Sequence, residues 1–147
     1  MANIYAPQQY RDKEACLSTL KDHLHQEQNR NIILGGDLNL VLNVEEKMGG
    51  SFHADPSSDS IEIVMESNNL LDIPPKNGKY TCSNKIIGKG NIKEMLDRFL
   101  IQDNILLNYS SVIYRIVQTS TANHKSVVIS LGNMENLGPI PFRYSQM

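Results

Sequence analysis

A short apolar run that ends in two glycines is the sequence feature that most constrains the fold. Residues 32–34 are Ile-Ile-Leu, and Gly35 and Gly36 follow them directly. Such a run predicts a buried strand that the glycines end. Asp37 and Asn39 come next, and in an extended chain their side chains point to the same side. There they can face a cation, a water or a phosphate oxygen. The alternative is an Asx turn that closes a loop.

The residues before this run predict a helix packed on a sheet. Residues 2–5 have the pattern of a strand that ends at Ala6 and Pro7, and residues 12–28 have a helical period. The apolar positions of that helix are spaced i, i+3 and i+7 and form one buried face: Leu17, Leu20 and Leu24. A strand at residues 31–34 completes a β-α-β succession, so the sequence predicts an α/β layered fold.

The rest of the chain predicts a second helix and several strands. Residues 40–58 are polar and broken by glycines and a proline, so we expect a surface loop there. Residues 60–68 predict a helix that Ser57 or Ser58 caps. Its buried face would hold Ile61, Val64 and Met65. Further strands are expected at residues 94–102, 111–117 and 127–131.

Size and composition indicate one domain in a reducing compartment. The chain has 147 residues, enough for a single core, and its 14 Lys and Arg against 16 Asp and Glu favour no particular partner. Cys16 and Cys82 are too few and too far apart for a disulfide framework or a zinc site. No apolar run is long enough for a membrane span, and no secretory signal precedes the first strand. We therefore expect an intracellular protein with no membrane partner.

A local basic strip is the one charge pattern that points to nucleic acid. Between residues 76 and 98 the only acids are Glu94 and Asp97. The strip predicts either a phosphate-binding surface or a solvated hairpin whose lysines protect its edges. Its cations are Lys76, Lys79, Lys85, Lys89, Lys93 and Arg98.

Asp97 and His124 are candidates for a catalytic pair. Asp97 is a lone acid in the apolar strand 95–101, where a carboxylate needs a partner or a solvent-facing position. Arg98 is one possible partner. His124, in a polar loop just before the last strand, is the other, because a carboxylate can fix the tautomer of an imidazole. With Asp37, Asn39 and the basic strip, this pair predicts phosphodiester hydrolysis by an activated water.

Five motifs carry a family resemblance over nearly the whole chain. They are Asn-Ile-Tyr-Ala-Pro at 3–7, Gly-Gly-Asp-Leu-Asn at 35–39, Asn-Gly-Lys-Tyr-Thr-Cys-Ser-Asn at 77–84, Leu-Asp-Arg-Phe-Leu at 96–100 and Asn-His-Lys at 123–125. In this order they resemble the endonuclease/exonuclease/phosphatase superfamily. More narrowly, they resemble the endonuclease domain of plant LINE-type retrotransposons. The implied fold is a layered α/β sandwich with a mixed sheet flanked by helices.

The resemblance implies a role for each matching residue. Tyr5 would contact the scissile phosphate, Asp37 would position or activate the water, and Asn39 would orient the phosphate. Asp97 would hold His124, which would act as acid or base or bind the phosphate in its charged form.

The resemblance also implies a cofactor, a substrate and the residues that bind them. The cofactor would be Mg²⁺, with Asp37 and Asn123 as metal residues. The substrate would be DNA, nicked on one strand and bound by Thr81, Lys79 and Arg98. A nuclear or cytoplasmic location would follow.

The chain departs from the family pattern at several places. Ala122-Asn123-His124 stands where the family has Ser-Asp-His, and Cys82 stands where plant relatives have Trp. The family's N-terminal part, which supplies an Asn and a metal-ligating Glu, has no counterpart. We therefore expect residues 1–134 to form a truncated domain that is weakly active or inactive and open to self-association. Residues 135–147 are expected to form a linker-like tail.

Three other interpretations remain open at this point. The chain could be a non-catalytic nucleic-acid-binding remnant that uses its basic strip on phosphates. It could hydrolyse a phosphoinositide or sphingolipid head group, as other branches of the superfamily do. It could also be a small α/β domain whose motifs match by coincidence.

Overall fold

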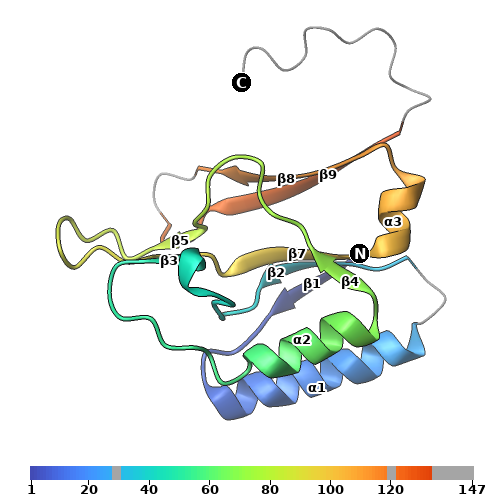
Figure 1. Ribbon diagram of the computed structural model, residues 1–147, viewed down its shortest axis with the longest axis horizontal. Helices are drawn as coiled ribbons and strands as arrows, with labels where there is room; N and C mark the ends of the chain where they lie inside the picture. Colours follow the sequence, from blue (N-terminus) through green and yellow to red (C-terminus); the bar gives the residue numbers. More distant parts are fainter. Residues whose placement is uncertain (28–30, 119–121, 134–147) are drawn as a thin grey trace, which may run out of the picture.

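The computed structural model describes residues 1–27, 31–118 and 122–133, and within them the chain forms three layers. Two helices lie on one face of a central four-stranded sheet, and a two-stranded sheet lies on the other face (Figure 1). A small three-stranded sheet lies at one end. The elements are β1 (Ala2–Tyr5), α1 (Tyr10–Gln26), β2 (Ile33–Asp37), η1 (Val44–Glu46), β3 (Lys47–Met48), α2 (Ser58–Ser67), β4 (Leu70–Asp72), β5 (Cys82–Ser83), β6 (Lys93–Glu94), β7 (Asp97–Gln102), α3 (Asp103–Asn108), β8 (Ser111–Val117) and β9 (Ser126–Gly132).

The central sheet is mixed, as the resemblance implied. Its order is β1-β2-β7-β4, with β1 parallel to β2 and the other neighbours antiparallel. Strands β8 and β9 pair with each other over their full lengths. The prediction of an α/β fold with a mixed sheet and flanking helices is confirmed.

The two faces of the central sheet bury separate apolar cores. The helix side is filled mainly by aliphatic side chains: Leu17, Leu24, Ile32, Leu34, Leu38, Leu40, Ile61, Val64, Leu70 and Leu100. On the other side, Phe99 and Tyr114 meet edge to face with ring centroids 5.1 Å apart. Met95 and Ile116 complete that second cluster, which joins the two-stranded sheet to the central one.

Strand β2 runs through the two glycines instead of ending at them, so that prediction was wrong. A Cβ on Gly35 would lie 2.6 Å from the Phe99 ring, and one on Gly36 would lie 1.9 Å from the carbonyl oxygen of Ile4. Gly36 also has a φ of +142°. The glycines are therefore required by close packing within the sheet and not by a turn.

Three other local predictions differ from the structure. Residues 40–58 are not simply a surface loop, because Leu40 and Val41 are buried and η1 and β3 lie within the segment. The strand expected at residues 94–102 is interrupted between β6 and β7. Within the described residues, no hydrogen bond from the side chain of Ser57 or Ser58 caps α2. The carboxylate of Asp55 accepts the Ser57 N–H instead.

Some predictions match and one lies outside the described residues. Strands β1 and β8 have the expected bounds, and Ile61 and Val64 are buried as expected, with Met65 partly buried. In the part of the chain that the structure describes, no helix combines the length and apolar character that crossing a membrane requires. The linker-like tail at residues 135–147 lies beyond the described residues.

We predict that Gly36→Ala destabilises the protein far more than Gly88→Ala. Both glycines have a positive φ, but nothing lies within 4 Å of a Cβ on Gly88. Gly88→Ala should therefore cost only conformational strain, about 1 kcal/mol. Gly36→Ala adds overpacking and should cost about 3 kcal/mol. Urea unfolding of the two variants measures the difference, and equal losses would contradict the close approach of β1 and β2.

Candidate active site

Two carboxylates meet at one end of the central sheet. Asp37 is the last residue of β2, Asp97 is the first residue of β7, and the antiparallel register places them directly opposite each other. They are 7% and 9% exposed. Directly opposite residues in a sheet project to the same face. The register therefore forces two acids into one buried position.

His124 contacts both acids from the two-stranded layer. Its Nδ1 lies 3.0 Å from Asp97 Oδ2, and its Nε2 lies 3.8 Å from Asp37 Oδ2. The backbone around it is fixed by bonds to the β5 segment, since the Lys125 N–H donates to Thr81 O and the Ser83 N–H donates to Asn123 O. The structure thus brings together the predicted pair of Asp97 and His124.

The segment from Asp37 to Asn39 is a turn, and the chain does not stay extended there. Asp37 Oδ1 accepts the Asn39 N–H at 2.8 Å, and Asn39 has a φ of +49°. The Asn39 Nδ2 donates to Ala6 O at 2.6 Å. The Asx-turn interpretation is therefore right, and the extended one is wrong. The turn nevertheless brings the Asn39 amide to the same cleft as His124.

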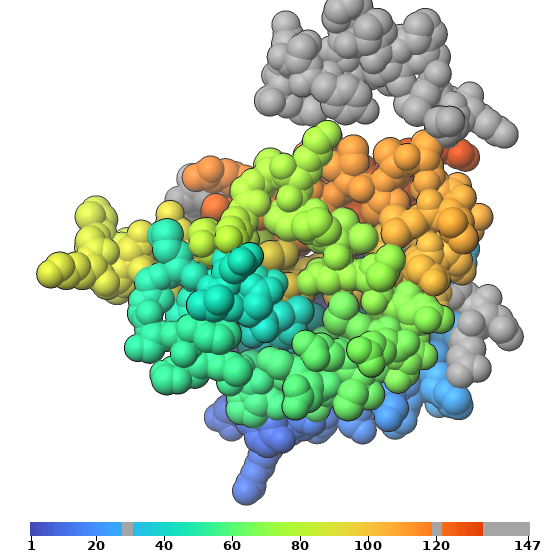
Figure 2. Space-filling model, viewed as in Figure 1, coloured from blue at the N-terminus to red at the C-terminus, as the bar shows by residue number. Residues whose placement is uncertain are grey.

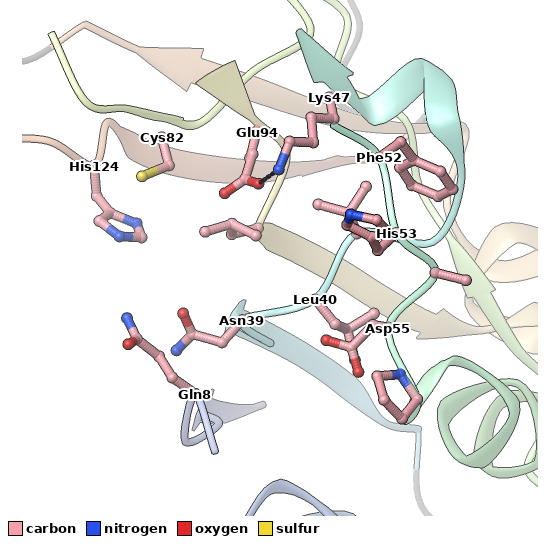
Figure 3. A pocket seen from close by; sticks show the side chains of 14 residues that line it. Gln8, Asn39, Leu40, Lys47, Phe52, His53, Asp55, Cys82, Glu94 and His124 are labelled. Carbon is pink, nitrogen blue, oxygen red and sulfur yellow. Dashed lines mark hydrogen bonds and ion pairs between the residues drawn. The ribbon is translucent and has the colours of Figure 1, made fainter. Parts of the chain in front are cut away.

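A cleft of about 450 Å³ opens beside these residues. In Figure 3, Asn39 and Gln8 lie on one side of the opening, and His124 and Cys82 lie on the other. Phe52, His53 and Asp55, from the segment that precedes α2, form the wall on the right of that view. The lining residues are Gln8, Asn39, Leu40, Val41, Lys47, Phe52, His53, Ala54, Asp55, Pro56, Cys82, Glu94, Leu96 and His124.

The electrostatics of the site raise the pKa of Asp37 above its ordinary value. Burial is the largest cause, and the nearby charge of Asp97 adds to it. The Asn39 N–H, His124 and Lys13 act in the opposite direction. Two like charges held opposite each other in a buried place therefore leave Asp37 with a raised proton affinity, as is common in functional sites.

Cys82 lines the same cleft but is a poor nucleophile there. Burial raises the pKa of its thiol, and the negative charges of Glu94, Asp97 and Asp37 raise it further. Because only the thiolate attacks, a thiol held protonated gives little covalent catalysis. Cys82 is therefore not a candidate nucleophile for hydrolysis at this site.

The donor set fits a divalent cation. Asp37, Asp97 and His124 each offer a ligand atom, and these atoms all lie within 4.8 Å of one another. Magnesium prefers carboxylate oxygens and is usually held by one or two of them with waters and substrate phosphates. Asp37 and Asp97 supply such oxygens, whereas the imidazole of His124 is already bonded to Asp97.

Two of the predicted DNA-binding residues are buried, so their direct role was wrong. The Thr81 side chain is inside the protein, where its Oγ1 accepts the N–H groups of Leu96 and Asp97 at 3.0 and 3.1 Å. Thr81 therefore fixes the start of β7 and cannot reach a DNA backbone.

Arg98 is the second of these buried residues. Its side chain is fully buried and forms ion pairs with Glu46 and with Asp72, the latter at 2.6 Å. No Asp97–Arg98 ion pair is described, and Asp97 is bonded to His124. Arg98 therefore has a structural role and is not part of the exposed basic strip.

Three predicted residues are exposed, and their roles stay predictions. Tyr5 is 74% exposed at the end of β1, opposite Asp37 in the sheet register. Lys79 lies 6.0 Å from the centroid of the Tyr80 ring. Asn123 is exposed just before His124. The loop between β5 and β6, yellow in Figure 2, projects from the body and carries further lysines of the strip.

Sequence reasoning missed Lys13, which is buried beside the site. Its Nζ donates to Asn39 O and to Asp55 Oδ2. A signal was present, because Lys13 lies four positions before Leu17 and therefore on the buried face of the helix. A lysine on that face needs a buried partner.

Comparison with known proteins identifies the fold. No protein-family model matches the sequence, and no curated protein matches it. Among solved structures, the endonuclease domain of TRAS1, a telomere-specific non-LTR retrotransposon, is similar with a TM-score of 0.59 and 19% identity. That match covers 80% of this chain and 51% of the other. A 3′-5′ exonuclease (NExo) from Neisseria meningitidis has a TM-score of 0.69 and 14% identity, with 88% and 60% covered.

The chain therefore spans about half to three fifths of the length of these two structures. At these identities the likeness shows a shared α/β fold of the endonuclease and exonuclease type.

We predict that Arg98→Met lowers stability without changing the DNA affinity of the folded protein. Removing the guanidinium leaves Glu46 and Asp72 without their buried counter-charge, which should cost about 3 to 5 kcal/mol. Chemical denaturation and DNA binding at low temperature measure the two effects. Exposed Arg11→Met is the control for loss of charge and should keep wild-type stability. A weaker DNA affinity at wild-type stability would show that Arg98 contacts DNA after all.

We predict that Asp37→Asn stabilises the protein increasingly as the pH rises. The pKa of Asp37 is raised in the folded state, so the folded state binds more protons than the unfolded state above pH 3.8. The wild type therefore loses stability as the pH rises through the raised pKa, and the neutral amide avoids this loss. The gain should be about 1 kcal/mol at pH 7 and shrink toward pH 4. Denaturation at several pH values in EDTA measures it, with exposed Asp59→Asn as control. A gain that is constant with pH would be inconsistent with the raised pKa.

Proposed function

We propose that this domain is a Mg²⁺-dependent DNA endonuclease of retrotransposon origin that hydrolyses a phosphodiester bond on one strand. The observation that carries the proposal is the convergence of Asp37, Asp97 and His124 at one end of the sheet beside an open cleft. Both similar structures are nucleases, one of them from a retrotransposon, which supports this class of reaction. The motifs that resemble plant LINE endonucleases support the finer assignment.

The two carboxylates are the residues that would hold the cation. Asp37 and Asp97 offer oxygens on the same side of the sheet. A bound cation would lower the raised pKa of Asp37, because a nearby positive charge favours the ionised carboxylate. When bound, Mg²⁺ supplies Lewis-acid polarisation of a phosphoryl oxygen. Asn123, placed next to His124, remains a proposed additional metal residue.

His124 is the proposed proton carrier of the site. Its Nδ1 bond to Asp97 orients the ring and leaves Nε2 on the side of Asp37. With the Nδ1–H tautomer, Nε2 accepts a proton from a water, and in the charged form it donates a hydrogen bond to a phosphate oxygen. Asp97 thereby acts through His124, as an orienting carboxylate does in other hydrolytic sites.

Asn39 and Tyr5 are the proposed phosphate contacts. The Nδ2 of Asn39 donates to Ala6 O, which fixes the amide plane so that its oxygen lies on the side of His124 in Figure 3. Tyr5 ends the neighbouring strand with its side chain exposed. Lys79 is the proposed contact to the DNA backbone farther from the reacting bond.

A second candidate function is DNA binding without cleavage. The observation that favours it is the neutral Asn123 at a position where the resembling family has an acid. Exposed lysines on and before the β5–β6 loop would supply the phosphate contacts, and the affinity would then fall steeply with salt.

We predict that the purified protein nicks supercoiled plasmid weakly in Mg²⁺, because the neutral Asn123 stands where the resembling family has an acid, and that EDTA stops the reaction. Asp37→Ala and His124→Ala should each lower the rate by about 10²- to 10⁴-fold, because each removes a group that acts on the water or the phosphate. Asp59→Ala and His23→Ala change the same residue types at exposed positions on α2 and α1 and should keep the wild-type rate.

The outcomes separate the two candidate functions. A folded protein that binds duplex DNA with a steep salt dependence but leaves the plasmid closed would replace the endonuclease by the binding function. A folded protein that neither binds nor cleaves DNA would overturn both.

A further inference from the structure

Lys13 is a buried cation with two close partners. Its side chain is 3% exposed, and its Nζ lies 2.6 Å from the backbone oxygen of Asn39 and 2.6 Å from Asp55 Oδ2. Burying an ammonium group is costly unless it is paired and hydrogen-bonded. The two short contacts supply that pairing and hold Lys13 and its partners in one arrangement.

The first partner of Lys13 belongs to the turn that forms the site. Asn39 has a left-handed backbone, which is uncommon for a residue with a side chain and needs support from its surroundings. Its N–H is held by Asp37, its Nδ2 is held by Ala6 O, and its carbonyl is held by Lys13. These three bonds together fix where the Asn39 amide lies relative to Asp37.

The second partner belongs to the wall of the cleft. Asp55 accepts the Ser57 N–H through Oδ1, and its backbone oxygen accepts the Ser58 N–H, so it sets the start of α2. It also lines the cleft together with Phe52 and His53 (Figure 3). Lys13 therefore joins three elements: helix α1, the turn after β2 and the segment before α2.

We propose that Lys13 is a positioning residue of the active site, which holds the Asp37–Asn39 turn and the Asp55 segment of the cleft wall in fixed relation to each other. This inference rests on the proposed function, because Lys13 would support the residues that carry out the reaction. Lys13 is not expected to bind the substrate directly, because its side chain is buried and does not line the cleft. It differs in this from the exposed lysines of the basic strip, which would contact phosphates directly.

The kinetic test compares Lys13→Met with Lys21→Met. Both substitutions remove one positive charge from α1, but Lys21 is exposed. In Mg²⁺, Lys13→Met should lower kcat for plasmid nicking by about 10- to 100-fold, because a small displacement of reacting groups has an effect of that size. KM should stay within about twofold, since Lys13 touches no substrate. Lys13→Arg keeps a cation at this place and should recover a large part of kcat, whereas Lys21→Met should match the wild type.

A second measurement is independent of activity. The NMR signals of the Asn39 side-chain amide and the His124 ring report the geometry of the turn. In Lys13→Met they should shift, and in Lys21→Met they should not. If the wild type does not nick DNA, the proposed function fails, and these signals still decide whether Lys13 positions the turn.

Two results would overturn the proposal. One is a folded Lys13→Met protein with wild-type kcat; the other is unchanged Asn39 signals in that variant. If Lys13→Met does not fold, Asp55→Asn replaces it, because the amide oxygen can still accept the Ser57 N–H while the ion pair is lost. Asp55→Asn should shift the same signals and lower kcat to a smaller extent, and wild-type values in both measurements would reject the role of Lys13.

Discussion

The antiparallel pairing of β2 with β7 is the constraint on which the rest of this structure depends. It places Asp37 opposite Asp97 and Gly35 opposite Phe99 in the same register. A shift by one residue would turn every side chain of the strand to the other face. The acids would then leave the cleft, and the Phe99 ring would lose the space that Gly35 gives it. Gly35 and the two acids are thus consequences of one pairing, because β2 needs a residue without a side chain opposite Phe99 and carries a carboxylate opposite Asp97. Gly36 is required by the neighbouring pairing with β1.

The same pairing separates a structural charge network from the candidate site. Along β7, neighbouring side chains alternate between the two faces of the sheet. Asp97 therefore points to the layer that carries His124, while Arg98 points to the helix side, where Glu46 and Asp72 hold it. This is why the adjacent Asp97 and Arg98 do not neutralise each other. Because of this alternation, Asp97 can orient His124, whereas Arg98 pairs with Glu46 and Asp72 and stabilises the fold.

The sequence predicted the fold class from local patterns, and it offered His124 as one of two partners for Asp97, with the family resemblance favouring His124. The helical spacing of Leu17 and Leu24 and the cost of an isolated Asp97 are visible in the sequence alone. The predictions failed where contacts between residues far apart in the sequence determine the structure. Gly36 faces the backbone of Ile4, and Thr81 is buried under β7, and neither contact leaves a local pattern. The roles assigned to the exposed Tyr5, Lys79 and Asn123 depend on a bound substrate, so neither pattern nor packing decides them.

The candidate site exists only when two layers are docked, which links its chemistry to the second core. Asp97 comes from the central sheet and His124 from the segment before β9, so their contact crosses the layer boundary. The Tyr114 hydroxyl donates to the backbone oxygen of Asp97, and its ring packs edge to face on Phe99. Loss of this packing would weaken the docking that holds the imidazole against its carboxylate. The apolar cluster around Phe99 therefore stabilises the fold and also sets the distance on which proton transfer at His124 would depend.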